Sequence, residues 1–219
     1  MDGLIRSAAD TLIALDLLDW GRVASLRSLG VSQSFNAVCL SNESTYEEVF
    51  VAGLSLRHFN FCLFDHSYFQ LSSTNRGSRL AYYPNPFIDP DGLLELIEDP
   101  VDFDAFELNE LRATAGKGPL RFDISPEQYV DINHPYAHFH LGHGELGRLS
   151  SRRRYCPHTF IMLVARLYYP EAWSKMNCQP DANGFRNSFD AKFVARLTAN
   201  GLIEDQYFSR AEECLVHVR

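Results

Sequence analysis

The sequence lacks the short motifs that mark the commonest nucleotide-binding and hydrolytic sites. It contains no Walker loop, no GxGxxG turn, no HExxH helix and no GxSxG nucleophile elbow. The P-loop, dinucleotide-binding, zinc-protease and α/β-hydrolase signatures are therefore excluded as explanations of the chain. Any chemistry must come from side chains that the fold brings together.

Paired cysteines and long apolar runs are also missing. The five cysteines are widely spaced and include no CxxC, so neither a disulfide framework nor a structural zinc cluster is predicted. The apolar run at 160–165 is far shorter than the ~20 residues of a membrane helix, and acidic residues interrupt the apolar N-terminal stretch. We expect no membrane contact and a reducing, cytoplasmic setting.

Positive charge is scarce. The 219 residues carry 20 Lys and Arg against 28 Asp and Glu, a net charge of −8. Overall charge therefore repels nucleic acid and anionic membrane, so an anion site needs a local reversal of sign. Hydrophobic residues make up 46% of the chain and charged residues 22%, which excludes disorder, collagen and coiled coil as whole-chain descriptions.

Hydrophobic periodicity predicts an α+β fold. An apolar stripe at helical spacing predicts a helix over 2–20, and a helix is expected to begin at Pro157. Alternating residues predict a hairpin over 59–71 and strands at 79–83, 120–124 and 137–141, with a last strand at 213–218. We expect one domain over 1–219: a curved antiparallel sheet of five or six strands, with helices packed on one face and an N-terminal helix within 1–21.

One segment has a strong acidic bias. Residues 85–111 contain nine acidic residues and no basic one, and two helices are predicted there, about 91–97 and 103–114. We interpret 85–115 as an acidic helical insertion. Two readings stay open for it: a solvated face, or a docking surface for a basic partner protein.

Several motifs occur together in a recognisable order. They are RFD at 121–123, HPYAHFHLG at 134–142, Arg148, CP at 156–157 and YPEAW at 169–173. Together they resemble the bacterial domain-of-unknown-function family numbered 2290, over roughly residues 60–175, and HPxxHxHLG is the most distinctive part. The resemblance implies a bacterial or phage-related gene. The RFD and HxH order is also distantly similar to small toxins of toxin–antitoxin pairs that carry RYD and HxH, which transfers no mechanism.

The histidine cluster is the first candidate site. His138 and His140 are two apart in a predicted strand, so both imidazoles face the same side, where they can act as acid and base at a phosphate or hold a metal ion. We expect them in one partly exposed cleft, with Arg121 or Asp123 within hydrogen-bonding reach. The alternative is that the histidines only cover a polar face of the strand.

A metal ion is not assigned to this site. A metal would need a third ligand, for which the candidates are Asp123, His134, His143 and Glu145. The predicted catalytic residues are therefore His138, His140, Asp123 and Arg121, with no cofactor assigned.

A cluster of arginines is the second candidate site. Arg152, Arg153 and Arg154 precede a predicted helix N-terminus, which attracts anions, and Arg148 lies nearby in the sequence. We expect these four residues to hold phosphate. The alternative is that they pair with the acidic segment.

Two functional hypotheses follow. The first is an effector or toxin-like enzyme of an anti-phage defence or toxin–antitoxin module, a phosphodiesterase or nuclease-like hydrolase acting on nucleic acid or nucleotide phosphate. The second is a non-catalytic subunit that docks a basic partner, encoded nearby, through its acidic segment.

Overall fold

Seven strands form one sheet in which the spatial order follows the chain. The computed structural model describes residues 1–75, 77–87, 118–143, 147–180, 188–214 and 217–218. The strands are β1 (Phe61–Cys62), β2 (Tyr68–Thr74), β3 (Gly77–Tyr83), β4 (Leu120–Ile124), β5 (Ala137–Leu141), β6 (Arg148–Ser151) and β7 (His217–Val218). Neighbours from β1 to β6 pair antiparallel, whereas β7 pairs parallel to β6.

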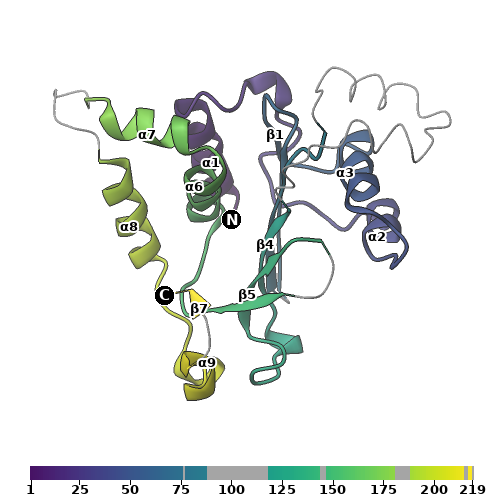
Figure 1. The fold of residues 1–219 in the computed structure, drawn as a ribbon, viewed down its shortest axis with the longest axis vertical. Coiled ribbons are helices and arrows are strands. Elements are labelled where there is room, and N and C mark those ends of the chain that lie inside the picture. The colour runs from purple at the N-terminus through teal and green to yellow at the C-terminus, as the bar shows by residue number, and fades with distance from the viewer. Residues whose placement is uncertain (76, 88–117, 144–146, 181–187, 215–216, 219) are drawn as a thin grey trace.

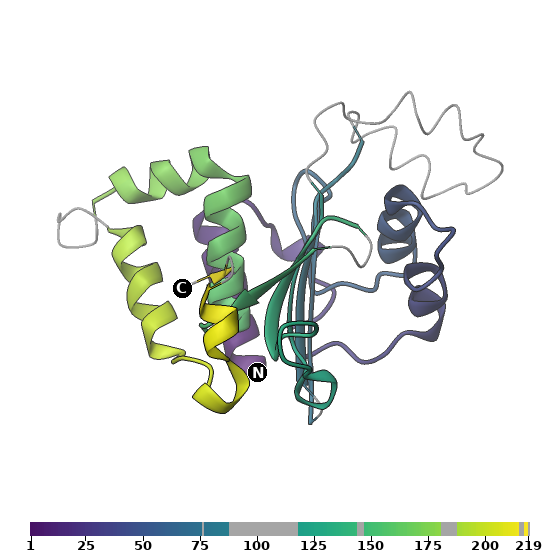
Figure 2. The same ribbon diagram turned by 60° about the horizontal axis from the view of Figure 1, so that its bottom comes forward.

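The predicted α+β class with a curved antiparallel sheet is confirmed, and the structure adds a second helical layer. Helices α1 (Asp2–Ala14), α6 (Pro157–Tyr168), α7 (Pro170–Cys178) and α8 (Phe189–Ala199) lie on one side of the sheet (Figure 1). Helices α2 (Gln33–Cys39) and α3 (Tyr46–Ser55) lie on the other side, as Figure 2 also shows. The expectation of helices on one face is corrected in this respect. A short helix, α9 (Arg210–Cys214), precedes β7.

The larger core lies between the sheet and helices α1 and α6. Alternate residues of the strands, such as Leu80, Phe122 and Phe139, point to this side and meet Leu12 and Phe160. Because side chains alternate along a strand, the intervening residues must point to the opposite face. There Ala81 and Tyr83 pack with Tyr68 and Phe50 under α2 and α3 in a second apolar cluster.

Local sequence signals explain several helix boundaries. Thr45 and Glu48 form a capping box at the start of α3, and Pro157 occupies the first turn of α6. The predicted helix over 2–20 ends at Ala14 instead, because Asp16 adopts a left-handed conformation with φ of 59°. The expected last strand at 213–218 is corrected too, since residues up to Cys214 are helical.

Residues 88–117, which include most of the acidic insertion predicted at 85–115, lie outside the described residues, so its two predicted helices and its docking role stay predictions. Among the helices of the described part, none is long and apolar enough to cross a lipid bilayer.

Candidate functional site

Two rows of polar residues cross four neighbouring strands on the face toward α2 and α3. The strand register aligns Arg79 of β3, Asp123 of β4, His138 of β5 and Ser150 of β6 in the first row. The second row aligns Ala81, Arg121, His140 and Arg148. Directly opposed side chains on adjacent strands are close neighbours, so the register alone assembles three arginines, two histidines and one aspartate.

Asp123 is clamped by two arginines. Its side chain is 6% exposed; Oδ1 lies 3.3 Å from Nε of Arg79 and Oδ2 lies 3.1 Å from Nε of Arg121. The Arg79 side chain is 49% exposed and that of Arg121 is 28% exposed. The clamp therefore connects a buried carboxylate to the protein surface.

His138 and His140 contact each other directly. Their Nε2 atoms are 2.9 Å apart, and Nδ1 of His138 lies 2.7 Å from the carbonyl oxygen of Pro135. Nε2 of His140 also lies 2.8 Å from Nη2 of Arg121 and 3.6 Å from Oδ2 of Asp123. The predicted proximity of Arg121 or Asp123 to the histidine pair is thus present for both residues.

Both imidazoles are neutral near pH 7. Burial lowers the pKa of His138 to about 4, although the Pro135 carbonyl and Asp123 oppose the shift. Burial, followed by the charge of Arg121, lowers the pKa of His140 to about 2. The pair therefore presents nitrogen lone pairs rather than positive charge.

The expected partly exposed cleft is not found. His138 is fully buried and His140 is 5% exposed. The ring of His134 packs edge-on against His138, with 4.9 Å between ring centroids. The two rings nevertheless lie outside both apolar clusters of the sheet, among Asp123 and arginine side chains, so this is a buried polar site.

Access to the site comes from its arginine side. A hollow of about 190 Å³ is lined by Arg79 and Asp123 together with the polar ends of β2, β3 and β4. Arg148, at the other end of the second row, is exposed. The hollow reaches Arg79 and Asp123, whereas His138 and His140 do not line it.

Cys39, the last residue of α2, also belongs to this neighbourhood. Burial raises its thiol pKa, while the nearby charges of Arg121 and Arg79 act in the opposite direction. The sequence gives no sign of this proximity, because the position of Cys39 depends on the packing of the second helical layer.

Arg152 and Arg154 have different neighbours from Arg148. Arg152 forms an ion pair with Asp205 and lies over the ring of Phe208. Arg154 lies 3.6 Å from Glu204. The acidic partners of these two arginines are therefore Asp205 and Glu204. The nine acidic residues of 85–111 lie outside the described residues, so pairing of arginines with that segment stays a prediction.

Arg153 and the start of α6 do not form the expected anion site either. Arg153 forms a backbone bridge with Leu202. The first residues of α6, Pro157 to Thr159, are buried. An anion therefore has no open access to the N–H groups at this helix N-terminus.

Of the other predicted metal ligands, His134 lies at the site and His143 does not. His134 joins the site, and its Nδ1 atom is buried without a hydrogen-bond partner. His143 instead contacts the Ser44 carbonyl through Nε2 at 3.0 Å. Glu145 lies outside the described residues.

The comparison with protein families now decides the relationship suggested by the motifs. A family profile described as "Uncharacterized conserved protein (DUF2290)" matches residues 23–218. The chain belongs to this family. The match extends well beyond the 60–175 stretch that carries the motifs, so in this DUF2290 member it includes α2, α3 and the C-terminal strand. Searches of curated proteins and of solved structures found no significant match.

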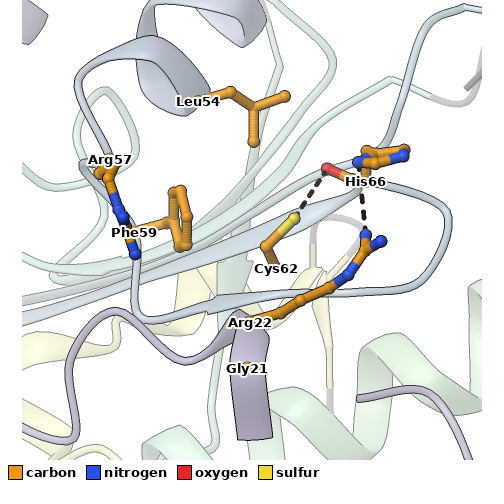
Figure 3. Close-up of a pocket in the computed structure, with 7 residues that line it drawn as sticks. All are labelled: Gly21, Arg22, Leu54, Arg57, Phe59, Cys62 and His66. Carbon is orange, nitrogen blue, oxygen red and sulfur yellow. Dashed lines mark hydrogen bonds between the residues drawn. The ribbon is translucent and has the colours of Figure 1, made fainter. Parts of the chain in front are cut away.

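The DUF2290 chain also has a cavity away from His138 and His140. Its volume is about 230 Å³, and Figure 3 shows Arg22, Cys62 and His66 beside Phe59 and Leu54 at its wall. Arg22 is already bonded to the Leu63 carbonyl and contacts Nδ1 of His66 at 3.4 Å. Burial raises the pKa of Cys62 to about 11, so its thiol is not a nucleophile at neutral pH. The polar rows remain the candidate site.

Proposed function

We propose that this protein is a hydrolase of phosphate esters that acts on a nucleic acid or nucleotide at the two polar rows. One observation carries the proposal: the rows gather Arg79, Arg121 and Arg148 beside two neutral imidazoles and Asp123. Three arginines against one aspartate leave a local charge of +2 in a chain whose net charge is −8. This is the local reversal of sign that an anion site requires.

The arginines suit a phosphate ligand. A guanidinium group presents fixed donors that match phosphate oxygens, and charged hydrogen bonds of this type are stronger than neutral ones. Arg148 has no acidic partner among the described residues, and Arg79 is half exposed. These two residues would receive the phosphate first, and Arg121 would bring it toward His140.

The imidazole lone pairs suit the chemical step. In hydrolysis, a water oxygen attacks phosphorus, one ester P–O bond breaks, and the water proton ends on the leaving oxygen. A neutral imidazole assists in one of two ways: it accepts the proton from water as a general base, or it binds a metal ion that activates the water. If an imidazole acts as the general base, His138 provides the lone pair on Nε2, because its Nδ1 hydrogen is donated to the Pro135 carbonyl.

The activity is tested with generic substrates and the intact chain. Wild-type protein is expected to cleave single-stranded RNA or DNA oligonucleotides or an activated phosphodiester, and His140→Ala is expected to lose about 10²–10⁴-fold in rate. His143→Ala is the matched control, because His143 is exposed and its contacts among the described residues are with the Ser44 carbonyl and the Tyr46 ring. Equal rates for wild type and a folded His140→Ala variant would remove the histidine pair from the chemistry.

A cytoplasmic effector role, in defence or in a toxin–antitoxin module, is the setting that we propose for such an activity. It follows from the distant motif similarity to small toxins, and its test is bacterial growth.

A further inference from the structure

The hydrogen-bonding pattern of His138 and His140 is incomplete. A carbonyl oxygen only accepts, so Nδ1 of His138 must carry the hydrogen that it shares with Pro135. In the neutral ring, Nε2 of His138 is then a bare lone pair. This lone pair faces Nε2 of His140 at 2.9 Å.

No tautomer of His140 satisfies both of its contacts. If its Nε2 atom accepts from Arg121, two lone pairs face each other across the 2.9 Å contact with His138. If Nε2 instead carries a hydrogen, it opposes a guanidinium N–H group at 2.8 Å, and guanidinium cannot accept. Nδ1 of His140 is buried and has no hydrogen-bond partner among the residues that the structure describes. A positive centre between the rings, either a proton or a metal ion, would satisfy the two facing lone pairs.

A carboxylate oxygen completes the donor set. Oδ2 of Asp123 lies 3.6 Å from Nε2 of His140, and one ligand atom from each of Asp123, His138 and His140 lies within 4.8 Å of the others. All three residues are more than nine-tenths buried. Two imidazole nitrogens and one carboxylate oxygen are the ligands of mononuclear zinc and related transition-metal centres.

We propose that Asp123, His138 and His140 bind one divalent transition-metal ion, with Zn²⁺ as the best-fitting ion. Two nitrogens bound to zinc at about 2.0–2.1 Å in a tetrahedral arrangement are about 3.3 Å apart, and the two contacts of His140 Nε2, 2.9 and 3.6 Å, lie on either side of that value. Three protein ligands leave the fourth position for water or a substrate oxygen.

The residues behind the ligands fit a metal centre as well. The Pro135 carbonyl holds the Nδ1 hydrogen of His138, which orients Nε2 toward the ion. Arg79 contacts Oδ1 of Asp123 and leaves Oδ2 facing the histidines. The polar hollow that reaches Asp123 supplies an entry path.

The positively charged Arg121 side chain competes with the metal ion for the same ligand atoms. Its Nη2 atom takes the His140 lone pair that the metal ion needs, and its Nε atom lies 3.1 Å from Asp123. When the ion binds, Arg121 loses its acceptor on His140, and its guanidinium group becomes available to a substrate phosphate. Removal of Arg121 is therefore expected to act in opposite directions on metal binding and on phosphate binding.

The test is a calorimetric titration of tag-free, chelator-treated protein with ZnCl₂, with MgCl₂ as the comparison. We expect one zinc site per chain, with Mg²⁺ roughly 100-fold weaker or more because nitrogen ligands disfavour it. His140→Ala should lower zinc affinity about 100-fold or more, whereas His143→Ala should leave it unchanged. Arg121→Met should leave zinc affinity equal or higher while phosphate affinity falls.

Other outcomes overturn the inference. The metal site is refuted if wild type binds no stoichiometric zinc, or if His140→Ala binds zinc as wild type does, which would place the ion on free cysteines such as Cys178. Should His140→Ala fail to fold, Asp123→Asn and the visible absorption of Co²⁺-loaded wild type report on the same ligands. Zinc binding is measured without substrate, so its result does not depend on whether the protein is a hydrolase. Hydrolysis that survives a chelator would keep the proposed function and remove the metal from it.

Discussion

Arg79 and Asp123 form an ion pair across β3 and β4, with 3.3 Å between Nε and Oδ1, although they are 44 positions apart in the chain. The pair joins a half-exposed guanidinium group to a buried carboxylate that faces both site histidines. It therefore links the surface where we propose that an anion arrives to the buried side chains of the candidate site.

Arg148→Ala should weaken the binding of phosphate-bearing ligands. A hydrogen bond to a charged group contributes about 1.5–3 kcal/mol, so we expect the affinity for a nucleotide or a short single-stranded oligonucleotide to fall about 10- to 100-fold. For the oligonucleotide, the slope of log affinity against log salt should become shallower by about one phosphate contact. The measurement is fluorescence anisotropy at several salt concentrations.

Arg6→Ala is the control for this experiment. It removes the same charge from an exposed position on α1. Equal losses of affinity in the two variants would mean that net charge, rather than the site, attracts the ligand.

His158 should make the stability of the protein sensitive to acid. Its Nε2 atom contacts the Thr11 hydroxyl at 2.8 Å between α6 and α1. Burial, followed by the charge of Arg196, lowers its pKa to about 4 against the opposing effect of Asp10. Between an unfolded pKa near 6.5 and the folded value, the unfolded chain binds more protons. This stabilising contribution is complete above about pH 6.5 and is lost as the pH falls toward 4.

The measurement is urea unfolding of wild type and His158→Gln from pH 7.5 to 4. Glutamine keeps a polar group near Thr11 but does not titrate. Wild type should lose more stability than the variant between pH 6.5 and 4, while contributions from all other groups cancel in the difference. Parallel curves over this range would show that His158 titrates alike in both states.

Gly53→Ala should destabilise the layer that covers the candidate site. A Cβ atom at Gly53 would lie 2.1 Å from the hydroxyl of Tyr68, whose fully buried ring stacks on Tyr83. Overpacking of this kind costs about 1–3 kcal/mol. Urea unfolding measures the change, and Gly3→Ala in α1, where a Cβ meets nothing within 4 Å, is the control and should be neutral or stabilising. A neutral Gly53→Ala would show that α3 moves freely against β2.

Expression of the wild-type protein alone should impair bacterial growth if it is an effector. His140→Ala should relieve the impairment, with circular dichroism to confirm that the variant is folded. If the protein instead docks a basic partner, charge reversal at Asp102, Asp104 and Glu107 should weaken partner capture in a salt-dependent way. Loss of capture by that variant together with a non-toxic wild type would favour the docking function.

The central strands could be predicted from the sequence because their pattern is local. Leu120–Ile124 and Ala137–Leu141 have the predicted bounds, since Phe122 and Phe139 alternate with polar residues. This alternation also places both histidines on the side of Arg121 and Asp123. In contrast, β6 is short and polar, and pairing with β5 defines it as a strand. The role of Arg79 depends on the register between β3 and β4, which no local pattern specifies.

The burial of the histidines and the ion-pair partners of the arginines could not be predicted from the sequence either. The histidine spacing indicates a shared face but not that His134 and the arginines would cover it. Arg152 and Arg154 precede a helix as predicted, yet their partners Asp205 and Glu204 are about fifty positions away. The capping box of Thr45 and Glu48 was a local signal for α3 that could have been read.

Nitrogen-detected NMR of the imidazole rings tests the central claim most directly. Tag-free wild-type protein, labelled at histidine, is titrated with a nucleotide while the Nδ1 and Nε2 resonances of His138 and His140 are followed. We expect saturable shifts at these two residues, and Arg148→Ala should move them to about 10- to 100-fold higher nucleotide concentrations. The resonances of His158, which lies between α6 and α1, should not change. Saturable binding that leaves His138 and His140 unchanged, or no binding at all, would contradict the assignment of the polar rows as a phosphate site.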